Sequence, residues 1–238
     1  MSKYRKYKDL LRDIPLFPDI FTNGMTRNLA HPKKSFMGRY TKRTMEKYNN
    51  VMIKNAVKLC QIQAHHAILE VGFGPGLGLQ EALKYLTDPR GKLFGLDVSE
   101  YMHKVARERL GPQLALGRVH LLQGRVECIP LPDHCIHGVF HSNCHLYWPD
   151  MATATAELLR VMRPGARMLA TCDLGFLRRG VDQGFFKGMT LEPEPYMQAL
   201  RAVGFLGVSM EDLTDEGKSF QVIYATSPPP STTETQTS

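Results

Sequence analysis

A short apolar run, Ala67-Ile68-Leu69-Glu70-Val71, opens directly into a glycine-rich segment, Gly72-Phe73-Gly74-Pro75-Gly76. Apolar, partly β-branched residues that end at a glycine cluster are typical of a buried parallel strand leading into a tight loop. Leucine and alanine then recur at near-helical spacing as far as Leu86, which predicts a helix. A loop between a strand end and a helix start is a common ligand-binding geometry, and its glycines allow the backbone to approach a ligand closely.

The spacing of the glycines distinguishes between two kinds of ligand. A dinucleotide fingerprint needs glycines at positions i, i+2 and i+5, but Leu77 or Leu79 occupies the last of these positions, so NAD is disfavoured. The pattern Glu-x-Gly-x-Gly-x-Gly in residues 70–76 instead resembles the first motif of the S-adenosylmethionine-dependent methyltransferases with a Rossmann-like fold. Residues 158–169 strengthen this resemblance, because they match the helix, Arg-Pro-Gly turn and fifth strand of that family.

The resemblance implies an α/β fold: a Rossmann-like three-layer sandwich with a seven-stranded, mostly parallel sheet, strand order 3-2-1-4-5-7-6 and an antiparallel last strand. It implies S-adenosylmethionine as the cofactor and methyl transfer to an unidentified acceptor, which we expect to be a small molecule. The glycine motif supplies four expected cofactor-binding residues, Glu70, Gly72, Gly74 and Gly76. The strands are predicted at Ala67–Val71, Lys92–Asp97, Val119–Leu122, Ile136–His141, Met168–Cys172, Phe205–Met210 and Ser219–Thr226.

Asp97 ends the second predicted strand, about twenty residues beyond the glycine loop. An aspartate there is placed to accept hydrogen bonds from the two hydroxyls of a ribose. The alternative is that Asp97 caps the helix that begins near Ser99, although Ser99 can serve as the cap itself. We therefore expect Asp97 to bind the cofactor.

The segment after the third strand departs from the family pattern. Arg125 stands where the resemblance leads us to expect an acidic residue that bonds adenine, and Glu127 is a candidate substitute. The backbone amide of Val126 is still expected to meet the adenine ring.

The loop after the fourth strand should face the reactive end of the cofactor, because this strand lies beside the first in an open α/β sheet. Asn143 is a candidate for both cofactor binding and catalysis, and His141 or His145 is a candidate general base. Cysteine and histidine crowd into residues 128–145, but their spacing does not suit zinc, so no metal site is expected.

The net charge of +7 is concentrated near the N-terminus, where residues 1–50 hold twelve Lys or Arg and four acidic residues. Such a segment suits contact with nucleic acid, an acidic membrane surface or an anionic substrate, or it is a solvated arm. A nucleic-acid-modifying methyltransferase and a non-catalytic binding module therefore remain as alternative functions, with nucleic acid not favoured.

Residues 1–40 are expected to form a basic N-terminal extension that includes a linker at 14–18, residues 41–226 a methyltransferase domain, and residues 227–238 a disordered tail. One helix is predicted over 41–61, and the glycine- and phenylalanine-rich residues 174–190 are expected to be mobile and able to close over an acceptor. The segment Phe36–Tyr40 resembles one that lies over the pocket in similar proteins. We expect a cytoplasmic protein without a membrane span, and a mitochondrial location remains as the alternative. Its cysteines are expected to be free thiols. The sequence indicates no oligomeric state.

Overall fold

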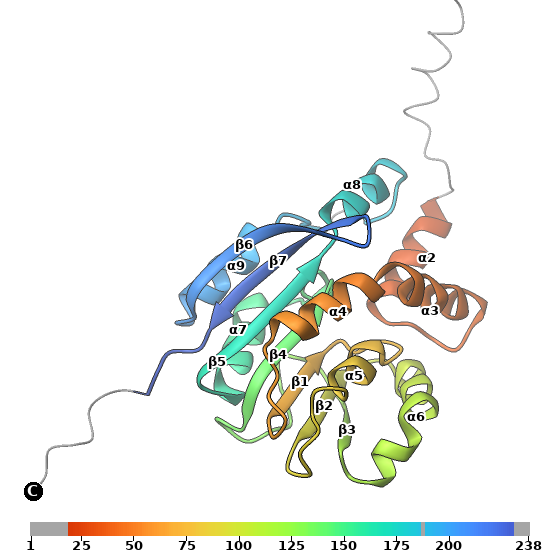
Figure 1. Ribbon diagram of the computed structural model, residues 1–238. Coiled ribbons are helices and arrows are strands. Elements are labelled where there is room, and N and C mark those ends of the chain that lie inside the picture. The colour runs from red at the N-terminus through yellow and green to blue at the C-terminus, as the bar shows by residue number, and fades with distance from the viewer. Residues whose placement is uncertain (1–18, 187–188, 231–238) are drawn as a thin grey trace, which may run out of the picture.

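The computed structural model describes residues 19–186 and 189–230, and within them seven strands form one sheet (Figure 1). The strand order is β3-β2-β1-β4-β5-β7-β6, as predicted. Strands β1 to β5 run parallel, whereas β7 runs antiparallel to both β5 and β6. The strands are β1 Ala67–Val71, β2 Lys92–Asp97, β3 Val119–Gln123, β4 Ile136–Ser142, β5 Met162–Cys172, β6 Leu206–Asp215 and β7 Lys218–Thr226.

Two helical layers cover the sheet and complete the predicted three-layer sandwich (Figure 1). Helices α4 (Asn50–Leu59), α5 (Leu77–Ala82) and α6 (Glu100–Ala115) pack on one face, and α7 (Met151–Val161) and α9 (Glu194–Ala202) pack on the other. Neighbouring β1 residues enter opposite cores, Ile68 the first and Leu69 the second, because side chains alternate along a strand.

Helices α2 (Asp19–Ala30), α3 (Phe36–Tyr48) and α8 (Leu174–Asp182) lie outside these layers, and the short 3₁₀ helix η1 (His145–Tyr147) follows β4. The single helix predicted over residues 41–61 is wrong, because the chain breaks at Asn49 between α3 and α4. Asparagine is a weak helix former, and the two helices bury their apolar residues against different neighbours. None of the helices in the described part of the chain is long and apolar enough to cross a bilayer.

Residues 174–190 also differ from expectation, because 174–182 form helix α8. Asp173 caps this helix by accepting a hydrogen bond from the Phe176 amide at 2.7 Å. Phe186 is buried against Leu174 and Leu177, and a Cβ on Gly180 would lie only 2.5 Å from its ring. Gly180 of α8 therefore makes room for the side chain of Phe186.

Strand β5 begins at Met162, earlier than predicted, because Pro164 disfavours helical backbone in the residue before it. The register of β5 against β4 shifts within this segment, and Gly165 there has φ +75°. Ser227 holds residues 163–166 in place by two hydrogen bonds. Its hydroxyl donates to the Arg163 carbonyl at 2.5 Å and accepts from the Ala166 amide at 2.9 Å. The predicted disordered tail is therefore wrong at buried Ser227, while 231–238, like 1–18 with the predicted linker, lie outside the described residues.

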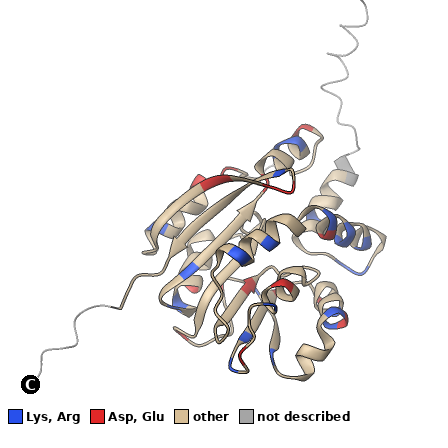
Figure 2. Cartoon of the chain, in the orientation of Figure 1, with Lys and Arg blue, Asp and Glu red and all other residues tan. Residues whose placement is uncertain are grey.

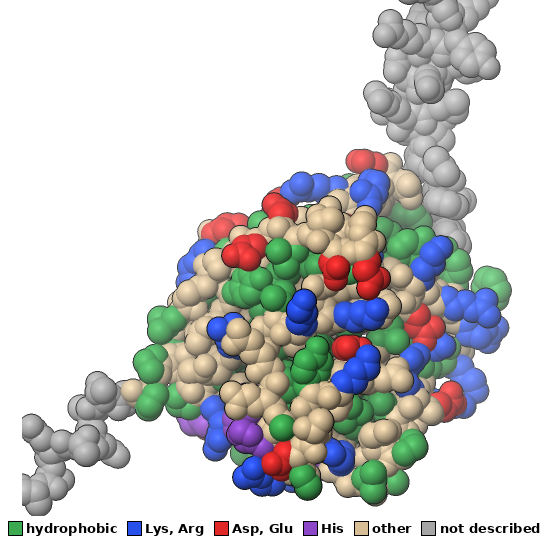
Figure 3. Space-filling view, in the orientation of Figure 1, with side chains coloured by type: hydrophobic (Ala, Val, Ile, Leu, Met, Phe, Trp, Pro, Cys, Tyr) green, Lys and Arg blue, Asp and Glu red, His purple; other side chains and the backbone are tan. Residues whose placement is uncertain are grey.

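The basic residues of the N-terminal segment that the structure describes lie on α3 and on the chain just before it, apart from Arg27 on α2 (Figure 2). The space-filling view shows Lys and Arg side chains gathered on that side of the molecule with apolar side chains among them (Figure 3). Residues 19–40 are thus folded as α2 and the start of α3.

Candidate functional site

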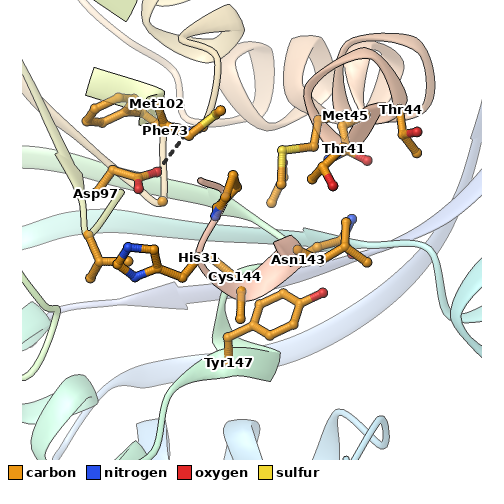
Figure 4. Close-up of a pocket in the computed structure, with 18 of the residues that line it drawn as sticks. His31, Thr41, Thr44, Met45, Phe73, Asp97, Met102, Asn143, Cys144 and Tyr147 are labelled. Carbon is orange, nitrogen blue, oxygen red and sulfur yellow. Dashed lines mark hydrogen bonds between the residues drawn. The ribbon is translucent and has the colours of Figure 1, made fainter. Parts of the chain in front are cut away.

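A cavity of about 850 Å³ lies at the carboxyl ends of β1, β2 and β4, beneath α2, α3 and α8. In an open α/β sheet this edge is the usual ligand-binding position. Asp97 and His31 lie at one end of the cavity and Thr41, Thr44 and Met45 of α3 at the other, with Asn143 and Tyr147 between them (Figure 4). The cavity thus joins a charged end to a largely apolar one.

The three glycines of the motif are required for three different reasons. Gly74 lines the cavity at φ +51°, and an added Cβ would meet only Met45 Sδ, at 3.7 Å, so the backbone is open to a ligand. Gly72 also lines it, but its Cβ would lie 2.7 Å from Cys144 Cβ. Gly76 does not line the cavity; it allows the loop to pack against Ala106 of α6, 3.2 Å from where a Cβ would lie.

Asp97 lines the charged end and holds the glycine loop in place. Its Oδ2 accepts a hydrogen bond from the Gly74 amide at 2.9 Å, and its Oδ1 accepts one from the Ser99 amide at 2.8 Å. Burial raises the pKa of this carboxyl, although both amide hydrogen bonds oppose the shift. Ser99, not Asp97, caps α6, since its hydroxyl accepts from the Met102 amide. The capping alternative therefore does not explain Asp97.

Glu70 is fully buried behind the glycine loop and also lines the cavity. Burial raises its pKa well above the ordinary value, and the nearby charge of Asp97 adds to the effect. Its Oε2 has no hydrogen-bond partner in the described protein. A Cβ at Gly78 would collide with Oε1, so this glycine, which the sequence analysis did not single out, makes room for the carboxyl group.

The chain after β3 presents Val126 and Glu127 to the cavity. The Val126 amide donates to no acceptor within the described part of the chain. Arg125, in the position expected to be acidic, is largely exposed, and its Nε lies 3.3 Å from Glu127 Oε2. Glu127 Oε1 is buried without a partner. A carboxylate is thus present at this strand end, two residues later than the family pattern places it.

Asn143 follows β4 in the left-handed conformation, φ +57°, which asparagine tolerates better than most residues. The backbone amide of Asn143 donates to the Thr171 carbonyl at 2.8 Å, and its buried side-chain Oδ1 has no partner in the described protein. Tyr147 lines the cavity from η1, and burial raises the pKa of its phenol. The loop therefore brings two polar side chains to the middle of the cavity.

His141 and His145 do not line the cavity. His141 Nε2 lies 2.8 Å from the Tyr196 hydroxyl, and the His145 ring stacks on the Tyr196 ring at 4.6 Å. Burial lowers the pKa of His145 to about 4 and that of His141 well below its ordinary value. Neither histidine therefore reaches the cavity in the described chain, and this geometry does not support a general-base role for either.

The apolar end of the cavity was largely missed from sequence. Phe36, Met37 and Tyr40 line it, as the family resemblance suggested. Met25 of α2 and His31 had no sequence signal. Residues 174–190 were expected to be able to close over an acceptor, and residues of α8 do line the cavity. The α8 residues that line the cavity are Phe176, Leu177, Arg179 and Gly180.

One side chain links this covering to the glycine loop. Arg109 of α6 donates from Nε to the Pro75 carbonyl at 2.8 Å and from Nη2 to Glu46 Oε1 of α3 at 2.5 Å. Glu46 also pairs with Lys42 at 3.3 Å. The position of α3 is thus tied to the loop through a partly buried ion pair.

Residues 68–165 match the model of a methyltransferase domain. An uncharacterized methyltransferase of Bacillus subtilis (strain 168), YdaC, is 38% identical over 105 residues, which are 44% of this chain and 55% of that protein. The ubiquinone/menaquinone biosynthesis C-methyltransferase UbiE of Pseudomonas fluorescens (strain Pf0-1) is 31% identical over 117 residues, 48% of this chain and 44% of that protein. The chain thus spans about half the length of these relatives.

A chain in the complex between the Haloferax volcanii Trm112 methyltransferase activator and a methyltransferase has a similar fold, with a TM-score of 0.67. The two sequences are 17% identical, and the match covers 79% of this chain and 92% of that chain. Residues 68–165 are therefore similar to a methyltransferase domain, and the strand order and the position of the glycine loop are those of a fold that this chain shares with that solved structure.

Proposed function

We propose that this chain binds S-adenosylmethionine in the charged end of the cavity and transfers its methyl group to a small, largely apolar acceptor held beneath α2, α3 and α8. The observation that carries the proposal is a set of three buried oxygens without partners in the described protein, all on cavity-lining residues: Glu70 Oε2, Glu127 Oε1 and Asn143 Oδ1. Leaving such acceptors unpaired is costly. A ligand rich in hydrogen-bond donors would satisfy them.

The residues present fit this cofactor. Adenine, ribose and the amino acid group of S-adenosylmethionine supply amino and hydroxyl donors, and the cavity supplies carboxylate or amide acceptors from Glu70, Asp97, Glu127 and Asn143. Asp97 already accepts one amide hydrogen bond on each oxygen, and each oxygen retains capacity for a second. The Val126 amide, which has no acceptor among the described residues, is suited to a ring nitrogen of adenine.

When bound, the cofactor supplies a methyl group already activated by a positively charged sulfur. A cation bound at this end of the cavity would favour the charged forms of Glu70 and Asp97, whose pKa values burial raises, because charges in a poorly solvated site interact more strongly than in water. Transfer forms a bond from the acceptor's nucleophilic atom to the methyl carbon while the carbon–sulfur bond breaks, its electron pair remaining on sulfur. The chain's contribution is alignment and the exclusion of water.

The loop after β4 places limits on the acceptor. Its titratable side chains on the cavity are Cys144 and Tyr147, and burial raises the pKa of both, so neither is poised to take a proton near neutral pH. This favours an acceptor whose nucleophilic atom already carries an available electron pair. The lining beyond Asn143, which includes Met25, Met37 and Phe186, favours an apolar body for that acceptor.

Titration calorimetry of the full chain with S-adenosylmethionine tests the first half of the proposal, with NAD as the negative control. We expect a dissociation constant of about 1–100 µM, the range of common enzyme affinities. Turnover is then followed as S-adenosylhomocysteine formed with a panel of apolar amines, thiols and phenols. Absence of binding at about 1 mM cofactor contradicts the cofactor assignment. Binding without product across the panel supports the non-catalytic module instead.

Glu127→Gln tests the displaced carboxylate. The substitution keeps the shape of the side chain but removes its charge, so we expect S-adenosylmethionine affinity to fall by about ten-fold. Glu108→Gln is the matched control, because it makes the same change on an exposed glutamate of α6 that does not line the cavity. Equal affinities for the two variants would show that Glu127 is not a cofactor ligand.

A further inference from the structure

Helix α3 exposes large aromatic side chains to solvent. Phe36 is 81% exposed, Tyr40 54% and Tyr48 42%, and Phe36 and Tyr40, four residues apart, lie on the same side of the helix. Exposed apolar side chains that gather in one place mark interaction sites, whereas scattered ones do not. The same three residues line the cavity, so they stand at its mouth.

The surface around these aromatic residues is strongly basic. Residues 33–48 hold six Lys or Arg and one acidic residue, Glu46. Lys42 and Arg109 both contact Glu46, so its charge is already paired. Five cations of this range have no acidic partner in the described part of the chain: Lys33, Lys34, Arg39, Arg43 and Lys47, whose Nζ lies 5.3 Å from the centroid of the Tyr48 ring. Figures 2 and 3 show this concentration of Lys and Arg over α3.

A shallow groove of about 290 Å³ runs between α3 and α6 beside this helix. It is lined by five cations and one acid, and the acid, Glu108, already pairs with Lys104 at 4.0 Å; the lining residues are Lys34, Arg39, Lys42, Arg43, Tyr101, Lys104, Val105 and Glu108. Such a groove suits a phosphate or carboxylate that bears an apolar neighbour.

We propose that α3 docks on the surface of an anionic lipid bilayer, with Phe36 and Tyr40 entering the headgroup region and the unpaired cations meeting lipid phosphates. This inference rests on the proposed function, because it makes the acceptor an apolar molecule that passes from the bilayer through the aromatic mouth into the cavity. Basic residues interleaved with exposed aromatic ones are the pattern of an interfacial helix.

A nucleic acid would also be attracted by the cations, but the cavity behind them favours the bilayer. Its α2 and α3 lining is made mainly of methionine, leucine and aromatic side chains, whereas reading a base would need a set of donors and acceptors at matched positions. Phe36 is also far more exposed than packing against the chain requires. Charge and apolar exposure together therefore point to lipid.

Co-sedimentation of the full chain with sucrose-loaded vesicles tests the proposal. Vesicles of phosphatidylcholine alone are compared with vesicles that also contain about 30 mol% phosphatidylserine. We expect binding to the anionic vesicles only. Arg39→Glu with Arg43→Glu should lower that binding at least ten-fold, to about one tenth or less, since each cation near the surface contributes several-fold. Lys58→Glu with Lys92→Glu is the matched control, because both residues are exposed and lie away from α3.

Phe36→Ser tests the aromatic contribution and should lower vesicle binding about five-fold, with Leu116→Ser, which replaces another exposed apolar residue, as its control. Equal binding to neutral vesicles, or equal binding by the Arg39/Arg43 variant and the parent, overturns the proposal. Tighter binding to single-stranded RNA than to vesicles, lost in the same variant, overturns it in favour of nucleic acid.

The Arg39/Arg43 variant is also titrated with S-adenosylmethionine, which it should bind like the parent, because neither arginine lines the cavity. Failure of vesicle binding with intact cofactor binding rejects the docking surface alone. Failure of the parent to bind the cofactor rejects the proposed function, whatever the vesicle result.

Discussion

The two ends of the cavity are built by different means. The charged end consists of residues at the ends of parallel strands, Glu70 in β1, Asp97 in β2 and Glu127 just after β3. Strand pairing sets their positions, for example Val71 opposite both Leu96 and His141. The apolar end is covered by α2, α3 and α8, which are held there largely by side-chain packing. The position of the first end follows from the sheet, whereas the second depends on which side chains meet.

Gly74→Val should break the charged end most severely. A branched side chain would enter the cavity from a loop at φ +51°, so we expect S-adenosylmethionine affinity to fall by about a hundred-fold or more. Gly217→Val is the control, because Gly217 has φ +70° in the turn between β6 and β7 and no neighbour within 4 Å. Calorimetry and melting of both variants separate lost binding from backbone strain. Similar affinities would mean that the loop does not approach the cofactor.

Asp97→Asn should have the next largest effect. It removes the charge and leaves one of two backbone amides, those of Gly74 and Ser99, without an acceptor, so we expect about ten-fold weaker cofactor binding and a stability loss of about 1–3 kcal/mol. Ser99→Ala is the informative companion, since it removes the α6 cap at about 1 kcal/mol and the hydroxyl's hydrogen bond to the Pro32 carbonyl but keeps the Asp97 carboxylate, and Ser99 itself does not line the cavity. If Ser99→Ala weakens cofactor binding equally, Asp97 acts only through loop stability.

His145→Phe tests whether the buried His145 has a role outside both ends of the cavity, in stability and not in binding or catalysis. In the folded protein the pKa of His145 is about 4, below its ordinary value of 6.5. As the pH falls from 6.5 towards 4, this histidine is therefore protonated in the unfolded chain before it is protonated in the folded one, and the free energy of unfolding decreases over that range. The free energy of unfolding changes by up to about 1.4 kcal/mol per pH unit in this range. The variant should narrow the difference in melting temperature between about pH 7.5 and pH 5 by several degrees, with unchanged cofactor affinity. Loss of methyl transfer at unchanged melting would instead restore a catalytic role.

Phe176→Ala should have the smallest effect on the charged end. Phe176 of α8 stacks on Tyr48 of α3 with ring centroids 5.7 Å apart, so its loss loosens the covering of the apolar end. We expect cofactor affinity within about two-fold of the parent and a raised KM for the acceptor. A ten-fold loss of cofactor affinity would show that the two ends are not separable.

This contrast also explains what the sequence could and could not predict. The sheet order and the positions of Glu70 and Asp97 follow from an apolar run, a glycine cluster and an acid at a strand end, which are local patterns with fixed consequences in this fold. Helices α2 and α8 over the cavity depend on contacts between distant residues, such as the Phe186 amide donating to Thr26 Oγ1 at 3.2 Å. The role of His145 could not be decided from sequence, because a histidine near a strand end is equally compatible with catalysis and with burial against Tyr196.

Arg109 gives the covering and the glycine loop a shared mechanical link. Its guanidinium is held at once by the Pro75 carbonyl and by Glu46 of α3, so α3 cannot swing outward without breaking a partly buried ion pair or drawing the loop with it. Any acceptor that displaces α3 must therefore change cofactor affinity, and by thermodynamic reciprocity the cofactor changes acceptor affinity by the same factor. The coupling between the affinities of the two ligands is consequently carried by a side chain that does not line the cavity.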